Sequence, residues 1–271
     1  MLECVVNVAE GRRLEVLDSL SAAAGPSLRD RHHDVVHNRG VFTLIDEVDR
    51  LRHSVRALSE VALETLDLRT HEGVHPRLGV LDVVPFVALD PNRADEAIAL
   101  RDETANWLAT TFDVPAFLYG ELDDGTTRTL PEVRRGAFIS LAPDRGPATP
   151  DPKWGATTVG ARGVLVAWNL RLRGVSLEEA TLVAAAIRGP AVRALAFSMG
   201  EFVQVSCNLI DPLSVGPSQV YDQVTGLLGR GAVDHAELVG LAPGALLQRE
   251  NPTRWPQLGL SEATTIEARL G

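Results

Sequence analysis

The sequence predicts an α+β protein made of two β-α-β-β-α-β-like units, each with a mainly antiparallel sheet and helices on one face. Short apolar runs alternate with amphipathic stretches in both halves of the 271-residue chain. Residues 142–155 hold four prolines and two glycines, which is too irregular for a helix or a strand. Gly200-Glu201 joins two apolar runs, a spacing typical of a hairpin. We therefore expect two subdomains, 1–162 and 163–271.

The first half carries the clearer periodicity. Apolar residues recur at spacings of three and four between Val48 and Ala62, which predicts an amphipathic helix. Gly25-Pro26 ends an earlier helix, and Pro91 suits the first turn of a later one. We expect strands at 4–8, 39–45, 80–87 and 115–119, and helices at 12–24, 48–65, 91–111 and 129–136.

The second half repeats the alternation. Ser176 and Glu179 form the sequence pattern of a capping box, which predicts a helix start. Proline and glycine separate the remaining apolar runs. We expect strands at 163–170, 193–199, 202–209 and 232–238, and helices at 176–187 and 215–228.

Composition excludes several classes of protein. The apolar content of 45% is enough for a substantial core, and the net charge of −10 argues against non-specific nucleic-acid binding. No apolar stretch reaches the length of a membrane span, and the N-terminus lacks the pattern of a signal peptide. Cys4 and Cys207 lie in apolar runs and are expected to be buried thiols. These features predict a cytoplasmic protein.

The most informative segment is the loop from His71 to Gly79. Gly73 and Pro76 make a helix improbable there, although two histidines four residues apart would otherwise suggest a metal site on a helix. The loop instead sets His75 beside Arg77. An imidazole next to a guanidinium suits proton transfer beside an anionic substrate. The alternative is that both side chains only hold the loop in place.

Other polar residues interrupt apolar runs. Asn7, Asn38 and Asn208 carry amides that need partners if buried, which a ligand or the backbone can supply. Asp82 breaks an apolar strand and needs an arginine or histidine partner; it either orients His75 or is structural. Arg39 begins a strand near the same face.

The irregular segment between the halves is either a domain linker or a binding loop. Lys153 and Trp154 are unusual in a passive linker. Trp154 offers a flat face to an aromatic ligand, and the glycines around it let backbone approach that ligand closely.

Four segments together resemble the formiminotransferase domain of glutamate formimidoyltransferases, the folate-dependent enzymes of histidine degradation. Weaker similarity continues through 204–209 and 237–241, so that nearly the whole chain is covered. The four segments are Leu2-Glu3-Cys4-Val5-Val6-Asn7-Val8-Ala9-Glu10-Gly11-Arg12, His37-Asn38-Arg39-Gly40-Val41-Phe42-Thr43, His75-Pro76-Arg77 through Asp82-Val83-Val84-Pro85-Phe86, and Trp154-Gly155-Ala156-Thr157-Thr158-Val159-Gly160-Ala161-Arg162.

The resemblance implies a transferase that moves a formimino group from N-formimino-L-glutamate to tetrahydrofolate, the co-substrate, without a metal. It implies two subdomains whose sheets face each other, helices on their outer faces, and a site between them. His75 matches the catalytic general acid/base. Arg77, Arg39 and Asn7 are candidates for binding substrate or folate. The segment that aligns with the folate-binding loop is Gly146, Pro147, Ala148, Thr149, Pro150, Asp151, Pro152, Lys153, Trp154 and Gly155.

The resemblance implies that this protein binds folate and a glutamate-derived small molecule. We expect it to bind neither nucleic acid nor a membrane. We further expect a homodimer, and, with the sequence ending at Gly271, no cyclodeaminase domain of the kind attached in the bifunctional animal enzymes.

This sequence departs from the family pattern at several positions, among them Val35 and Val36, near which the family favours acidic residues. Val6 replaces a usual proline, Ala9 a usual serine, and Val74 a glutamate immediately before the catalytic histidine. That glutamate would favour a cationic amidine donor, so a formyl donor or a non-catalytic folate- or anion-binding role stays open. A metal-dependent hydrolase that uses His71, His75 and either His37 or His33 is a third hypothesis, which rests on the number of histidines alone.

Overall fold

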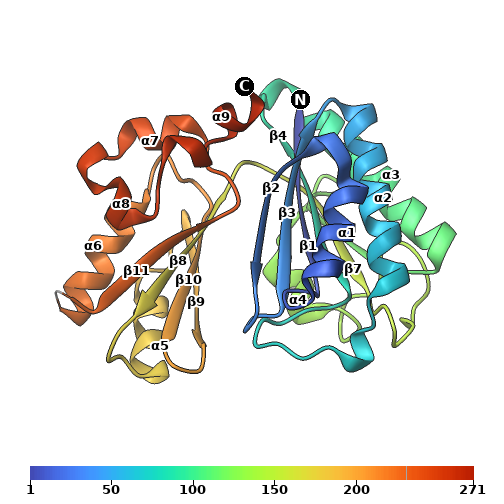
Figure 1. The fold of residues 1–271 in the computed structure, drawn as a ribbon. Helices are drawn as coiled ribbons and strands as arrows, with labels where there is room; N and C mark the ends of the chain where they lie inside the picture. Colours follow the sequence, from blue (N-terminus) through green and yellow to red (C-terminus); the bar gives the residue numbers. More distant parts are fainter. Residues whose placement is uncertain (230) are drawn as a thin grey trace. The chain divides into compact units, whose positions relative to one another are not determined.

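The computed structural model describes residues 1–229 and 231–271, and within it the chain divides into two units, Met1–Gly163 and Val164–Gly271 (Figure 1). All of the strands and helices that the apolar pattern predicts are present, with ends that differ by three residues or fewer. Both units combine a sheet with helices, so the predicted α+β class is confirmed.

The first unit holds a seven-stranded mixed sheet in the order β2-β3-β1-β4-β7-β5-β6. Neighbouring strands from β2 to β4 are antiparallel, and β7 lies parallel to both β4 and β5. The strands are β1 (Leu2–Val8), β2 (Leu28–Asp34), β3 (Arg39–Asp46), β4 (Leu81–Ala88), β5 (Ala116–Glu121), β6 (Thr127–Arg128) and β7 (Thr157–Arg162). The helices are α1 (Leu14–Ala24), α2 (Val48–Thr65), α3 (Ala94–Phe112) and α4 (Leu130–Gly136).

Helices cover both faces of this sheet, to different extents. The long helices α1, α2 and α3 lie along one face of the sheet (Figure 1). Their apolar side chains are buried in one cluster with Leu118 and other alternate strand residues. The preceding residue of β5, Phe117, points to the opposite face and packs in a second cluster with Val133 of α4. The expectation of helices on one face therefore holds for α1 to α3 and is wrong for α4. That short helix brings side chains to the face opposite the main core.

Three strands of this unit were not expected from the sequence. Strand β2 reads Leu-Arg-Asp-Arg-His-His-Asp, pairs only with β3 and is half-buried along its length. As an edge strand it needs no apolar alternation, so its sequence carries no strand signal. Strand β7 is rich in threonine and contains Gly160, where an added Cβ would lie 2.0 Å from the ring of Tyr119 on β5. The glycine lets that ring lie flat on the sheet. Strand β6 is only two residues long.

The second unit is a four-stranded antiparallel sheet in the order β11-β8-β10-β9. The expected capping box is present, because the Ser176 hydroxyl and the Glu179 carboxylate cap each other's backbone N–H groups. The elements are β8 (Val166–Leu172), α5 (Leu177–Ala186), β9 (Val192–Ser198), β10 (Val203–Leu209), α6 (Pro217–Leu228) and β11 (Val233–Val239). Three short helices that the sequence did not predict follow, namely α7 (Gly244–Arg249), α8 (Trp255–Leu258) and α9 (Ile266–Leu270).

The two units share one strand order. Read as β2-β3-β1-β4 and β9-β10-β8-β11, both follow the β-α-β-β-α-β path with the same neighbours, and the first unit adds β7, β5 and β6 beyond β4. Among the helices of residues 1–229 and 231–271, none is both long and apolar enough to cross a membrane.

Candidate active site

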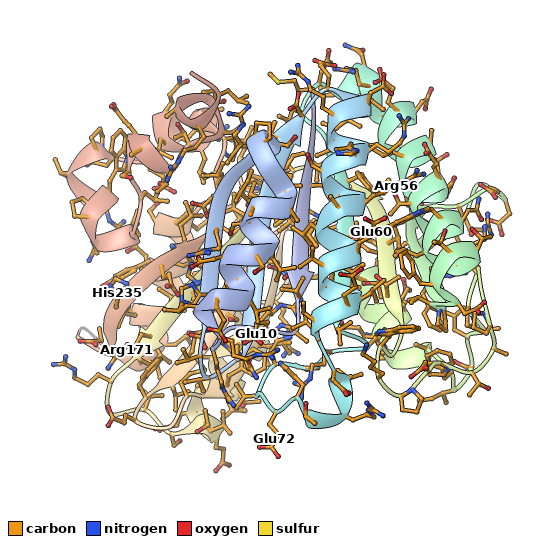
Figure 2. The ribbon with its side chains drawn as sticks, turned by 45° about the vertical axis from the view of Figure 1, so that its right-hand side comes forward. Glu10, Arg56, Glu60, Glu72, Arg171 and His235 are labelled. Atoms are coloured by element: carbon orange, nitrogen blue, oxygen red, sulfur yellow. The ribbon has the colours of Figure 1, made fainter. Side chains whose placement is uncertain are left out.

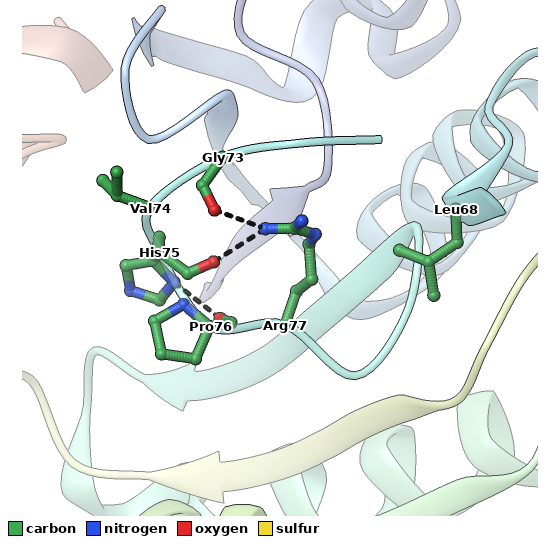
Figure 3. A pocket seen from close by; sticks show the side chains of 6 residues that line it. All are labelled: Leu68, Gly73, Val74, His75, Pro76 and Arg77. Carbon is green, nitrogen blue, oxygen red and sulfur yellow. Dashed lines mark hydrogen bonds between the residues drawn. The ribbon is translucent and has the colours of Figure 1, made fainter. Parts of the chain in front are cut away.

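The loop from His71 to Gly79 connects the end of the α2 region to β4 and contains no helix. This confirms that His71 and His75 do not share a helical face. The loop borders a hollow of about 330 Å³ (Figure 3). The residues that line this hollow are Leu68, Gly73, Val74, His75, Pro76 and Arg77.

A turn before β3 holds this loop from one side. Asn38, at φ 48°, donates from Nδ2 to the carbonyl of Glu72 at 2.9 Å and accepts the N–H of Gly11 at 2.9 Å. A Cβ at Gly73 would lie 2.2 Å from the carbonyl oxygen of His37, so only glycine allows this approach. Asn38 is therefore a backbone bracket in the structure. Figure 2 shows the side chain of Glu72 pointing outward from the loop, and it is exposed.

Arg77 holds the loop from the inside. Its Nη1 donates to the carbonyl oxygens of Gly73 and His75 at 3.0 and 2.9 Å (Figure 3). Its Nη2 donates to the carbonyl oxygen of His71 at 3.0 Å. A substrate carboxylate would compete with three backbone acceptors for this guanidinium. The geometry thus favours loop closure as the task of Arg77, and carboxylate binding by it stays a prediction.

Below the loop lies a buried carboxylate between two guanidiniums. Asp82 is 0% exposed, and its Oδ2 accepts from Arg39 Nη1 and Arg134 Nη2, both at 2.6 Å. Its Oδ1 accepts the N–H of Leu78 at 2.8 Å. Burial alone would raise the pKa of Asp82, but the two arginines and these hydrogen bonds lower it to about 2. The expected arginine partner of Asp82 is thus present, together with a second one.

Asn7 and Arg39 support each other in this cluster. Arg39 donates from Nε to Asn7 Oδ1 at 2.9 Å, while Asn7 donates from Nδ2 to the carbonyl of Val5 at 2.8 Å. Of the two interpretations of Asn7, these contacts favour the bracket. It holds the guanidinium of Arg39 toward Asp82, so any contact of Asn7 with a ligand stays a prediction.

The hydrogen bond of His75 defines its neutral form. Nδ1 lies 2.7 Å from the carbonyl oxygen of Pro76, and a carbonyl can only accept, so Nδ1 carries the proton and Nε2 the lone pair. The ring of His37 meets this imidazole edge to face with 5.7 Å between centroids. Burial, helped by the positive charge of Arg39, lowers the pKa of His75 to about 3. At neutral pH the protein without ligand therefore holds an unprotonated imidazole, with its lone pair on Nε2.

The proline-rich segment, expected as a linker or a binding loop, returns beside the His75 loop. The N–H of Leu68 donates to the Lys153 carbonyl at 2.7 Å, and that of Val80 donates to the Trp154 carbonyl at 2.9 Å. Gly155 forms a bridge with Gly79. The C-terminal end of the segment is therefore fixed next to the residues that border the hollow.

Trp154, whose ring the sequence suggests as a flat face for an aromatic ligand, packs against the protein itself. Its ring packs against the core of the first unit, and its Nε1–H donates to the Leu63 carbonyl at the end of α2 at 2.8 Å. The ammonium of Lys153 lies 5.3 Å from the ring centroid. The sequence could not reveal this because the partner, Leu63, is 91 residues away.

We expect Trp154→Ala to lower the free energy of unfolding by about 3 kcal/mol, since it removes a ring packed on the core and an indole hydrogen bond. Trp154→Phe keeps most of the packing and should cost about 1 kcal/mol. Urea unfolding measures both changes, and calorimetry with folinic acid measures ligand affinity. If Trp154→Ala weakened folinic acid binding and left unfolding unchanged, the ring would be a ligand contact.

Arg134 is the site residue that sequence reasoning missed. It lies on α4, 52 residues from Asp82, and its only sequence signal is an arginine in the last turn of a short capped helix.

Cys4 and Cys207 are free and buried, as expected, and burial raises the pKa of Cys207 to about 12. Within the described parts of the chain, no group of three or more His, Cys, Asp and Glu side chains is arranged to hold a metal ion.

Comparison with known proteins identifies the family of this chain. Residues 1–162 match the model of the formiminotransferase domain, N-terminal subdomain. The chain is 31% identical to a glutamate formimidoyltransferase of Streptococcus pyogenes serotype M1, over 91% of this chain and 90% of that protein. It is 29% identical to the Thermoplasma acidophilum protein of the same name, over 90% and 88%. A formimidoyltransferase-cyclodeaminase of Rattus norvegicus is 32% identical over 90% of this chain but only 50% of its own length. The chain belongs to the formiminotransferase family.

Proposed function

We propose that this protein transfers a formimino group from N-formimino-L-glutamate to N5 of tetrahydrofolate, a step of histidine degradation. The observation that carries the proposal is His75, which is neutral, has its lone pair on Nε2 and sits on a loop held by Arg77 and Asn38. Family membership and the similarity to named glutamate formimidoyltransferases supply the reaction class.

The proposed reaction needs one group that both accepts and returns a proton. The attacking folate nitrogen loses a proton, and the departing glutamate nitrogen gains one. His75 accepts the first proton at Nε2 and returns one to the leaving nitrogen. Its low pKa keeps the imidazole unprotonated in the protein without ligand, which the first step requires. The carboxylates of a bound donor oppose the charge of the nearby arginines, which raises this pKa and makes the imidazolium a usable acid for the second step.

The charges around His75 fit an anionic donor. Arg39, Arg77 and Arg134 contribute three positive charges, and Asp82 balances one of them. N-formimino-glutamate carries two carboxylates and one amidinium, so its net charge is opposite to that of the cluster. We propose that Arg39 and Arg77 bind the carboxylates of this donor.

We further propose that folate contacts the segment 146–155. What supports this is the position of its end, where the Lys153 carbonyl accepts from Leu68 at the hollow. We also propose that the protein is cytoplasmic and forms a homodimer. Both cysteines are free and buried, which is in keeping with a reducing compartment. Light scattering after size-exclusion chromatography tests the dimer.

A second candidate function follows from Val74. Its side chain is 43% exposed at the rim of the hollow and points away from Arg77 (Figure 3). The family pattern has a carboxylate at this position, which would attract a cationic amidine. Without it, a neutral formyl donor or binding without catalysis becomes the alternative.

We expect Val74→Glu to raise transfer from N-formimino-glutamate while leaving transfer from a formyl donor unchanged or lower, because the new carboxylate stabilises positive charge at the rim. Steady-state assays of both variants with both donors and tetrahydrofolate measure this. Val35, 56% exposed, offers a matched control as Val35→Glu. Robust wild-type formimino transfer that Val74→Glu does not alter would show that the missing glutamate has no role in donor choice.

A further inference from the structure

Helix α4 places one arginine under the His75 loop. A capping box between Thr129 and Glu132 starts the helix, and Val133 is buried with Phe117 on the sheet face opposite the main core. The helix is thus fixed at its start and on its inner side. The next residue, Arg134, is directed toward β4 and the loop.

Arg134 bridges two acceptors that both bear on His75. Its Nη2 donates to Asp82 Oδ2 at 2.6 Å, and its Nη1 donates to the Pro76 carbonyl at 3.3 Å. The same carbonyl oxygen accepts Nδ1–H of His75 at 2.7 Å. One guanidinium therefore connects the buried carboxylate with the oxygen that determines which imidazole nitrogen is protonated.

We propose that Arg134 is a positioning residue that fixes the proton of His75 on Nδ1 and so presents Nε2 as the base. The planar fork of a guanidinium holds one N–H on the carboxylate and another on the carbonyl in a fixed geometry, which the rotating N–H groups of an ammonium do not impose. Held in place by Asp82, it keeps the Pro76 carbonyl oriented toward Nδ1. The role of this residue in catalysis rests on the proposed function, whereas its effect on the imidazole does not.

Arg134 can act on His75 through its charge and through its hydrogen bonds. Other charged groups also face this imidazole. Arg39 on β3 and Asp82 on β4 act on His75 by charge, and His37 meets its ring. Arg39 shares Asp82 with Arg134, but its hydrogen bonds go to Asp82 and Asn7 and not to the Pro76 carbonyl. Loss of the Arg134 charge should therefore change the pKa of His75, while loss of its forked contact should change the tautomer.

The test is nitrogen NMR of histidine-labelled protein, with the His75 signals assigned by their absence from His75→Gln. In the wild type, Nδ1 should be protonated and Nε2 unprotonated at pH 7. Arg134→Gln removes a positive charge that lowers the pKa of His75, so the pKa should rise toward 6.5, with a mixture of both tautomers. Arg134→Lys keeps the charge, so the pKa should stay low while the tautomers mix.

Kinetics give a second readout. Arg134→Gln and Arg134→Lys should each lower kcat on the order of tenfold, less than loss of the proton-transfer group itself. Arg135→Gln is the matched control, because Arg135 is the exposed neighbour on the same helix and should behave as wild type. If both Arg134 variants keep the wild-type His75 tautomer, Arg134 is only structural and the proposal is wrong. If they shift the tautomer in a protein without formimino transfer, the proposed function fails and the positioning role stands. Should Arg134→Gln not fold, the tautomer in Arg134→Lys decides alone.

Discussion

Replacement of His75 by alanine should lower kcat for formimino transfer by about a hundredfold or more, the usual contribution of a positioned proton-transfer group. The affinity for folinic acid should change little, because the imidazole acts on moving protons and not on the bound ring. Single-turnover rates and calorimetry separate the two quantities. His53→Ala is the control, since His53 is an exposed histidine on α2.

The pH dependence of the same reaction follows from the charge around His75. The base must be unprotonated to accept a proton, and burial with the charge of Arg39 lowers its pKa to about 3 in the free protein. Activity due to His75 is therefore kept as the pH falls through 6.5 and is lost only as it approaches the lowered value. kcat/KM, which reports the free enzyme, should show no loss due to His75 near pH 6.5. For the His75→Ala replacement itself, a fall in kcat of less than about threefold would mean that other groups carry the proton transfer.

The sequence was sufficient for the parts of the fold that local pattern determines. Apolar periodicity predicted β1, β4 and α2, and the pair of glycine and proline in the His71–Gly79 loop excluded a helix there. It failed for β2, which lies at the edge of the sheet beside β3, and for β7, which follows the proline-rich segment and whose glycine accommodates Tyr119. In both cases, the tertiary environment and not the local sequence selects the strand.

The sequence singled out His75, but it did not reveal the contacts that surround this residue. His75 lies on a loop whose composition and family pattern both point to function. Arg77 contacts carbonyl groups of its own loop, and Asn7 and Trp154 contact residues that are distant in the sequence. The spacing of residues along the chain does not reveal these contacts. Arg134 has no local signal beyond its place in the last turn of a short capped helix, because its significance comes from Asp82 and Pro76, both more than 50 residues earlier.

The buried carboxylate should dominate the stability of this region. Asp82→Asn removes the negative charge from between Arg39 and Arg134, whose side chains are mostly buried, and leaves two guanidiniums facing each other. We expect a loss of about 3 to 5 kcal/mol in the free energy of unfolding, as for other buried pairs that lose one partner. Denaturant unfolding at pH 7 measures it. Asp49→Asn provides the contrast: that carboxylate is 92% exposed in its ion pair with Arg52, and its loss should cost no more than about 1 kcal/mol.

Two further measurements show whether charge is the cause of the Asp82 effect. Arg134→Met alone should strongly lower the free energy of unfolding. In the Asp82→Asn background the same change should cost much less, because it then removes an uncompensated charge. Additive losses of free energy would show that shape and not charge matters. The pKa of Asp82 is lowered to about 2 from an ordinary 3.8, so its charge stabilises the fold above pH 3.8 and that stability is lost as the pH falls through about 2. The difference between wild type and Asp82→Asn should therefore persist from pH 7 down to about pH 4 and shrink below it. A difference that vanished already at pH 5 would place the responsible titration on another group.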